Sequence, residues 1–319
     1  MSLPTKNDVQ PTDPVLTNML VGYYQADDRF VASRAFPIVP VPNDNGKYNI
    51  WTKKYWFLNG LKRRAPGGPF AQIDAAVETG TYTTVQQAGE SAVADETQNN
   101  SQLPGPGLIQ SKVKLLGQHS LIKKEVSWAS DFMKTSIWNG GTDGSVTAKF
   151  NLHGTSDPWL DIADTAMRTV SNNTGVEPTT AVMGYIVHNR LCNHPDLIDR
   201  LKYTTAIKGG VMAAAMAEIF GLSQWLVSRA SYNSANEGQT FSGSAIVDDD
   251  LLLIYVNPSA GLFEPTAGKT FVWAGGGGQG SIYYVRDARH HTDIVQIKEQ
   301  WDQASVALDV GYIFLDCCD

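Results

Sequence analysis

The segment LCNHPDLIDRL, residues 191–201, concentrates side chains that bind metal ions or transfer protons. Cys192, His194, Asp196 and Asp199 fall within eight residues. Thiolate, imidazole and carboxylate groups are the usual protein ligands of zinc. One interpretation is therefore a metal-dependent hydrolase that uses Cys192, His194 and Asp196.

A second interpretation assigns the same residues to the start of a helix. Pro195 suits the first helical position, and Asn193 or His194 would cap it. Asp196 would lie in the first turn, where the helix dipole favours an acid, and could pair with Arg200 four residues on. The buried side would consist of Leu197, Ile198 and Leu201. Every polar residue has a role without a metal, so this interpretation is favoured.

Three other segments have weaker chemical potential. GGGGQG, residues 275–280, is followed by a predicted strand, whereas a phosphate-binding loop must open a helix, so we expect a strand-to-strand loop. In HHTD, residues 290–293, the neighbouring histidines would point to opposite faces of an extended chain, so we expect an exposed loop. The acidic run at 248–250 lacks the spacing of a calcium loop and is expected to be a solvated turn. The sequence therefore predicts no catalytic, cofactor-binding or metal-binding residue, and no cofactor.

Composition narrows the class of protein further. The 319 residues have a net charge of −7, and nothing resembles the basic groove that duplex binding requires. Three cysteines, at 192, 317 and 318, cannot form a disulfide framework and favour a reducing compartment. The apolar runs are too short to span a bilayer. We expect a soluble, cytoplasmic product.

The pattern along the chain predicts the elements that would position these residues. Pro37, Pro40 and Pro42 favour extended backbone in a proline-rich arm over residues 1–45. Residues 46–102 have too few apolar side chains for a core of their own, and indicate a two-stranded excursion that needs a partner surface.

Two helices are predicted after the LPGPG segment. The first spans residues 108–133, with one stripe formed by Leu115, His119, Ile122, Val126, Ala129 and Met133. Because it is on this stripe, His119 is expected to be packed or hydrogen-bonded. The second begins with Asp157 as cap and Pro158 as first residue, and ends at Gly175. Its buried stripe would consist of Trp159, Ile162, Ala163, Ala166, Met167 and Val170.

The remaining pattern is of short mixed elements and a terminal hairpin. Residues 180–284 indicate a compact α+β unit. The last segment predicts a long antiparallel hairpin that turns near residues 302–305. Its second strand would be half-buried, with alternating Val306, Leu308, Val310, Tyr312 and Phe314.

Six segments resemble the major capsid proteins of tailed bacteriophages, whose Hong Kong 97-like fold is shared with herpesvirus shells. They are ASRAFPIVPV (32–41), SDPWLDI (156–162), TGVEPTTAVMGYIVHNRLCNHPDLIDRLK (174–202), YNSANEG (232–238), GKTFVWAGG (268–276) and DVGYIF (309–314). The resemblance implies an α+β fold in four parts. These are an N-terminal arm (1–45), an extended two-stranded loop (46–102), a peripheral domain with a long spine helix (103–180 and 285–319) and an axial domain (181–284).

The resemblance also implies a structural function without catalysis. Such proteins assemble as hexamers and pentamers into an icosahedral head shell that encloses double-stranded phage DNA without sequence-specific binding. The implied partners are further copies, a portal, a scaffolding protein and a decoration protein, with no membrane. The implied location is the virion capsid, after assembly in the host bacterial cytoplasm. The alternatives are the hydrolase described above, or another phage structural or carbohydrate-binding module that presents Trp51 and Trp56.

Overall fold

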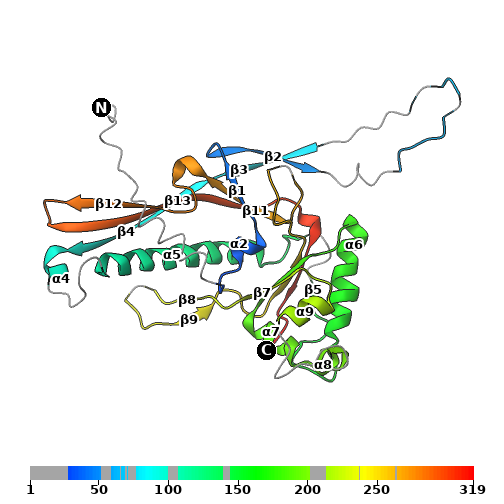
Figure 1. Cartoon of the computed structure of the whole chain (residues 1–319). Coiled ribbons are helices and arrows are strands. Elements are labelled where there is room, and N and C mark those ends of the chain that lie inside the picture. The colour runs from blue at the N-terminus through cyan, green and yellow to red at the C-terminus, as the bar shows by residue number, and fades with distance from the viewer. Residues whose placement is uncertain are drawn as a thin grey trace.

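The described part of the chain is an elongated molecule built on two five-stranded sheets (Figure 1). The computed structural model describes residues 28–51, 59–64, 66–68, 70, 77–99, 107–138, 144–201, 213–236, 238–262 and 264–319. Two further pairs of strands form separate hairpins. Within these residues, no helix has the combined length and apolar character needed to cross a bilayer.

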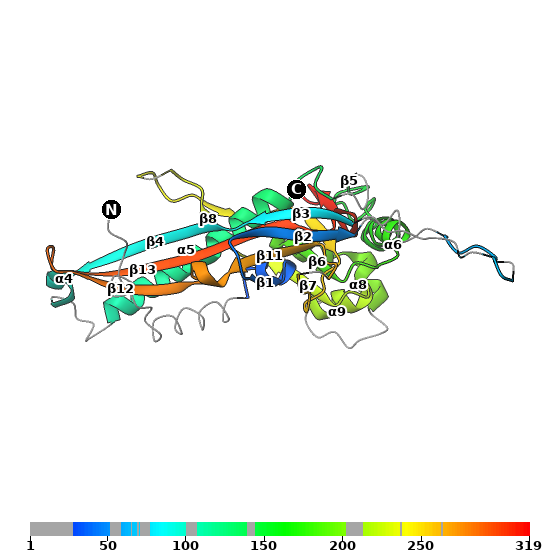
Figure 2. The ribbon, with the colours of Figure 1, turned by 90° about the horizontal axis from the view of Figure 1, so that it is seen from above.

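The first sheet is organised by one long strand. This 14-residue strand, β13, pairs with β11 and β12 on one side and with β4 on the other. The strands of this sheet are β1 (Ile38–Val41), β4 (Val85–Ala94), β11 (Gly268–Trp273), β12 (Ser281–Asp287) and β13 (Thr292–Ser305). The short helices at its ends are α4 (Asp95–Asn99) and the 3-10 turn η3 (Ala274–Gly276). The result is a long, narrow blade (Figure 2).

One long helix runs beside this blade. Helix α5 (Gly107–Phe132) has 26 residues and so measures about 39 Å, within one residue of the predicted bounds at each end. The predicted stripe was largely misplaced, because Leu115 is 45% exposed and His119 is exposed, although Ala129 is buried as predicted. The buried face also includes two charged residues, Lys124 and Glu125. An apolar pattern counts such residues as solvent-facing, and that shifted the predicted face.

The second sheet forms the core of the compact unit. Its order is β5–β14–β10–β6–β7, and every residue of β6 and β10 is buried. These strands are β5 (Gly144–Ser145), β6 (Thr180–Gly184), β7 (Gln224–Ser228), β10 (Leu251–Ile254) and β14 (Gly311–Leu315). The helices of this unit are η2 (Leu160–Met167), α6 (Arg168–Thr174), α7 (Tyr185–Cys192), α8 (Pro195–Leu201) and α9 (Ala213–Ile219). Strands buried on both faces have continuous apolar runs rather than alternation.

The helix predicted after Asp157 is present with both of its end signals. The Asp157 carboxylate accepts the backbone N–H groups of Trp159 and Leu160, each at 3.1 Å. Gly175 ends the helix with a left-handed φ of 69°. Ile162 is fully buried, as predicted. The π-helical winding of η2 has no sequence signal that we recognise.

The predicted terminal hairpin was wrong. Strand β13 continues through the expected turn to Ser305, and the chain then crosses to the second sheet through the 3-10 turn η4 (Leu308–Val310). There β14 pairs with β10 and β5. Its two faces contact different hydrophobic cores. Tyr312 and Phe314 pack in one core and Ile313 in the other. The strand is therefore buried on both faces rather than half-buried.

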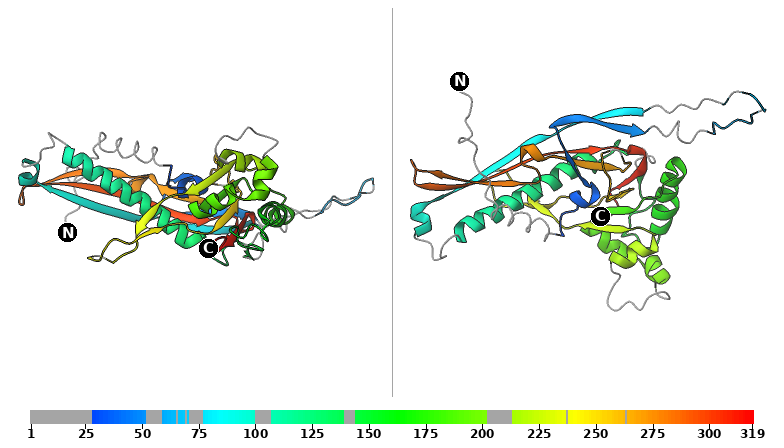
Figure 3. Two further views of the ribbon diagram at one scale, coloured as in Figure 1. Left: turned by 90° about the horizontal axis from the view of Figure 1, so that it is seen from below. Right: turned by 45° about the horizontal axis from the view of Figure 1, so that its top comes forward.

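Two hairpins extend from the sheets, as Figure 1 and the right-hand view of Figure 3 show. The first pairs β2 (Asn45–Trp51) with β3 (Val77–Thr83), where the two-stranded excursion was expected. The second pairs β8 (Ser231–Asn233) with β9 (Gly243–Ala245). Before them, a one-turn helix α2 (Ala32–Ala35) leads into β1, which pairs in parallel with the sheet edge at β11. Residues 38–41, which include Pro40, are extended, as predicted.

Candidate assembly surfaces

The segment 191–201 is a helix start, as favoured from its sequence. Pro195 is the first residue of α8, and Leu197 and Leu201 are buried, while Ile198 is 38% exposed. Asp196 lies in the first turn. The guanidinium of Arg200 lies 4.3 Å over the Trp159 ring and so joins α8 to the start of the neighbouring helix.

His194 instead belongs to a buried polar contact that the sequence did not reveal. Its Nε2 lies 2.9 Å from Ser156 Oγ, and Asp196 Oδ2 lies 3.7 Å from its Nδ1. The Ser156 hydroxyl also lies 2.9 Å from the Leu152 carbonyl oxygen, and when it donates there His194 Nε2 carries the proton and donates to Ser156. A nucleophilic serine needs the reverse, a histidine that accepts its proton. With Ser156 only 4% exposed and His194 fully buried, this arrangement joins α8 to the preceding loop.

Cys192 has the environment of a structural thiol. Burial raises its pKa to about 11, and its Sγ lies 3.6 Å from His188 Nδ1, which accepts the indole N–H of Trp225. A metal ligand requires the thiolate, which is scarce at such a pKa. Among the described residues, no three His, Cys, Asp or Glu side chains converge to hold a metal ion.

The glycine-rich and histidine-rich segments follow their predictions in part. Residues 275–280 connect β11 to β12, so this is a strand-to-strand loop. The side chains of His290 and His291 are 76% and 72% exposed at the turn between β12 and β13. Asp293, by contrast, is buried inside β13 and pairs with Arg286 at 2.8 Å.

The acidic run at 248–250 is a turn, but it is not fully solvated. Asp250 is part-buried, and its carboxylate accepts the backbone N–H of Asp316 at 3.1 Å. Burial raises the pKa of Asp250 to about 6, helped by the charges of Asp249 and Asp248 and opposed by that hydrogen bond. Of the two tryptophans of the binding-module alternative, Trp51 ends β2 and Trp56 lies outside the described residues.

Glu125 anchors the arm to the body, a role the sequence did not signal. Its carboxylate is fully buried and accepts the backbone N–H groups of Val31 and Ala32 at 3.0 and 2.8 Å. The hydroxyl of Ser228 donates to it at 3.0 Å. Burial raises the pKa of Glu125, and these hydrogen bonds oppose the rise. One side chain of α5 therefore holds the start of α2 and the end of β7.

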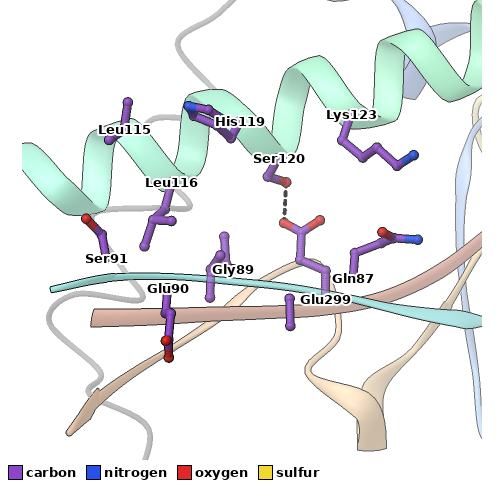
Figure 4. A pocket seen from close by; sticks show the side chains of 12 residues that line it. Gln87, Gly89, Glu90, Ser91, Leu115, Leu116, His119, Ser120, Lys123 and Glu299 are labelled. Carbon is purple, nitrogen blue, oxygen red and sulfur yellow. Dashed lines mark hydrogen bonds between the residues drawn. The ribbon is translucent and has the colours of Figure 1, made fainter. Parts of the chain in front are cut away.

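A groove of about 410 Å³ lies between α5 and the first sheet (Figure 4). In Figure 4, Leu116 and Ser120 point from the helix towards the strands, and Ser120 donates to Glu299 at 2.5 Å. The groove is lined by Gln87, Ala88, Gly89, Glu90, Ser91, Leu115, Leu116, His119, Ser120, Lys123, Ile297 and Glu299. Glu299 is buried and pairs with Lys124 at 3.2 Å, which fixes the helix on the sheet.

The outer rim of this groove is an edge strand. Within the described residues, β4 pairs with β13 alone, so the ten-residue β4 has one edge without a partner strand. Unpaired edge N–H and C=O groups form a template for another chain, and natural proteins usually cover them. The exposed Leu115 lines the same groove. Together they define a surface suited to contact with another chain.

A second hollow, of about 490 Å³, lies between α7 and the β8–β9 hairpin. Tyr185, Ile186 and Phe241 line it and are 51%, 42% and 74% exposed. The Arg229 guanidinium lies 5.0 Å over the Tyr185 ring.

Comparison with known proteins gives the fold a class. No protein-family model matches the chain. It is 27% identical over 267 residues to the major capsid protein of Burkholderia phage BcepMu, across 81% of this chain and 82% of that protein. A crystal structure of a phage-related protein from Bordetella bronchiseptica RB50 aligns over 97% of this chain and 98% of its own, with a TM-score of 0.73 and 24% identity. The mature capsid of bacteriophage PhiM1 aligns over 88% of this chain and 85% of its own, with a TM-score of 0.53 and 11% identity.

The long helix beside the β13 sheet, the projecting β2–β3 hairpin and the compact α+β unit thus form the Hong Kong 97-like capsid fold of tailed phages. The chain is thus similar over most of its length to a phage major capsid protein, and this similarity together with the fold supports a structural, non-enzymatic role.

Proposed function

We propose that copies of this chain associate as hexamers and pentamers, which close into an icosahedral head shell around double-stranded DNA. The observation that carries the proposal is the exposed apolar surface on the β2–β3 excursion. Leu61 and Phe70, between these two strands, are 86% and 82% exposed. Such side chains favour burial against another copy, because each contributes about 1.5–3 kcal/mol when removed from water.

The groove beside β4 supplies a surface of the complementary kind. Its free strand edge and the half-exposed Leu115 offer main-chain and apolar contacts to an extended segment of a neighbour. Several weak contacts of this kind, repeated around a closed ring, give a stable assembly through multivalency.

The four parts implied by the resemblance are retained here as a proposal, with revised bounds. Strands β11 and β12 pair with β13, and β14 pairs with β10. Strand pairing therefore favours moving residues 268–284 to the peripheral domain and residues 306–319 to the axial domain. We keep the arm at 1–45 and the extended loop at 46–102.

The remaining parts of the proposal concern partners and location. A net charge of −7 supports a shell that encloses DNA without binding it tightly. Tight binding through counterion release would need clustered Lys and Arg side chains. A portal, a scaffolding protein and a decoration protein are proposed as further partners. Assembly in the host bacterial cytoplasm before incorporation into the virion is proposed on the same basis.

Sedimentation of the purified protein over a range of concentrations tests this function. The wild-type chain should form large particles, whereas Leu61→Ser with Phe70→Ser should shift mass towards small species. Lys62→Ser with Arg63→Ser is the matched control on the same excursion, and it should assemble like the wild type. A double apolar variant that assembles as well as the control would contradict the role of this surface.

A further inference from the structure

The base of the β2–β3 hairpin carries an unusual cross-strand pattern. Tyr82 lies opposite Gly46, and Tyr48 lies opposite Gly80. A Cβ atom at Gly46 would lie 2.5 Å from Tyr82 Oη, and one at Gly80 would collide with the Tyr48 ring. Each tyrosine therefore lies flat across the glycine of the other strand. Only glycine leaves room for that arrangement.

Both tyrosine rings pack on one side chain of the body. Tyr82 stacks on Phe271 with ring centroids 4.6 Å apart and planes at 23°. Tyr48 lies 5.3 Å from the same ring at 31°. Phe271 is fully buried in β11, and the two tyrosines are 5% and 4% exposed. Stacked aromatic pairs favour defined ring orientations over simple apolar contact.

Polar contacts around the rings fix the same junction. The Tyr48 hydroxyl donates to the Ser305 carbonyl oxygen at 3.3 Å, and the Thr83 backbone N–H donates to the Asp302 carboxylate at 3.0 Å. Thr84 donates to the Asp44 carbonyl oxygen at 2.8 Å. Asp44 and Thr84 directly flank the paired strands β2 and β3. A strand advances about 3.3 Å per residue, so a tilt at this base moves the far end of the hairpin by a growing distance.

We propose that Tyr48, Tyr82 and Phe271 form an aromatic clasp that positions the extended loop, setting the direction in which it meets a neighbouring copy. The inference rests on the proposed function, since the direction of the loop matters for assembly only if a neighbour must receive it. A merely structural cluster would affect stability in proportion to the volume removed. The clasp predicts a loss of loop direction beyond that loss of stability.

Distance measurement within one chain separates these roles. The distance between spin labels at Glu78→Cys and Lys134→Cys, in a Cys192→Ser background, measures the position of the hairpin relative to the body. An excess of unlabelled protein ensures that distances between labels on different chains do not contribute. Tyr48→Leu with Tyr82→Leu keeps apolar side chains at both positions but removes the stack. The matched control is Val39→Ala, which truncates a buried member of the same cluster on β1. Gly80→Ala displaces the Tyr48 ring from the opposite side without removing any group.

The clasp predicts at least a twofold broader distance distribution in the double leucine variant and in Gly80→Ala. Val39→Ala should keep the wild-type width at any temperature below its own unfolding transition. Electron microscopy of the same proteins should show closed shells lost with the clasp and retained in Val39→Ala. A wild-type distance distribution in both clasp variants would overturn the inference, as would shell yields that follow thermal midpoints alone. If the wild type formed no shells, the proposed function would fail while the distance measurement still decided the clasp.

Discussion

The carboxylate of Glu125 accepts the backbone N–H of Ala32 at 2.8 Å, across 93 residues of sequence. This contact joins the long helix of the blade to the short helix that precedes β1. The exposed N–H groups of a helix start favour a negative partner, and here that partner is buried in the body. Glu125 therefore helps to fix the place where the arm meets the body, together with the pairing of β1 with β11.

Removing this anchor should destabilise the subunit. Glu125→Ala leaves the N–H groups of Val31 and Ala32 and the hydroxyl of Ser228 without their acceptor, and buried unsatisfied donors cost about 1–3 kcal/mol each. We expect a loss of at least about 3 kcal/mol in the free energy of unfolding, measured by denaturant titration. Asp131→Ala, an exposed carboxylate on the same helix, should stay within about 0.5 kcal/mol of the wild type. Equal effects of the two substitutions would contradict the anchor.

The raised pKa of Asp250 predicts how the stability of the protein changes with pH. The pKa of Asp250 is raised from 3.8 to about 6 in the folded protein. The protonated group therefore contributes its full stability below pH 3.8, and this contribution is lost as the pH rises through about 6. Asp250→Asn keeps an oxygen to accept the Asp316 N–H and removes the charge. It should therefore raise the unfolding free energy at pH 8 by on the order of 1 kcal/mol, discounted for solvent screening, and change little near pH 4. A variant with the same stability difference at both pH values would count against this assignment.

The cysteines should be poorly reactive in the folded protein. Burial raises the pKa of the Cys192 and Cys318 thiols to about 11, and Cys317 is fully buried. Alkylation depends on the thiolate, so at pH 8 labelling should be about two orders of magnitude slower than in guanidinium chloride. Mass spectrometry over a time course measures this. Labelling of Cys192 at the denatured rate would restore the reactive-site interpretation of residues 191–201.

The groove beside β4 should tolerate a polar change in the free subunit but not in the shell. Leu115→Glu alters a side chain that is 45% exposed, so the subunit should remain folded. Covering that carboxylate with a neighbour would be unfavourable by more than about 1.4 kcal/mol, which predicts about a tenfold or greater loss of shell yield. Light scattering follows assembly. Gln110→Glu adds the same charge at an exposed position of the same helix and is the control; equal yields from both variants would exclude the groove as a contact.

Local signals in the sequence predicted the starts and ends of helices better than the partners of strands. Pro195 with Asp196, and Asp157 with Pro158, placed two helix starts correctly because capping depends on nearby residues. The buried face of α5 was misplaced, because Lys124 and Glu125 are buried by partners on distant segments. For the same reason alternation at 306–314 indicated a strand but not its sheet. The Tyr48–Phe271–Tyr82 clasp was not predicted for the same reason. Its stacked rings Tyr82 and Phe271 are more than 180 residues apart in the sequence.

Negative-stain electron microscopy of the concentrated wild-type protein tests the central claim most directly. A structural capsid role predicts ring-shaped capsomers or closed, curved shells, with more of them at higher concentration. A strictly monomeric protein at every concentration and salt condition, or one that forms only small fixed oligomers, would contradict it.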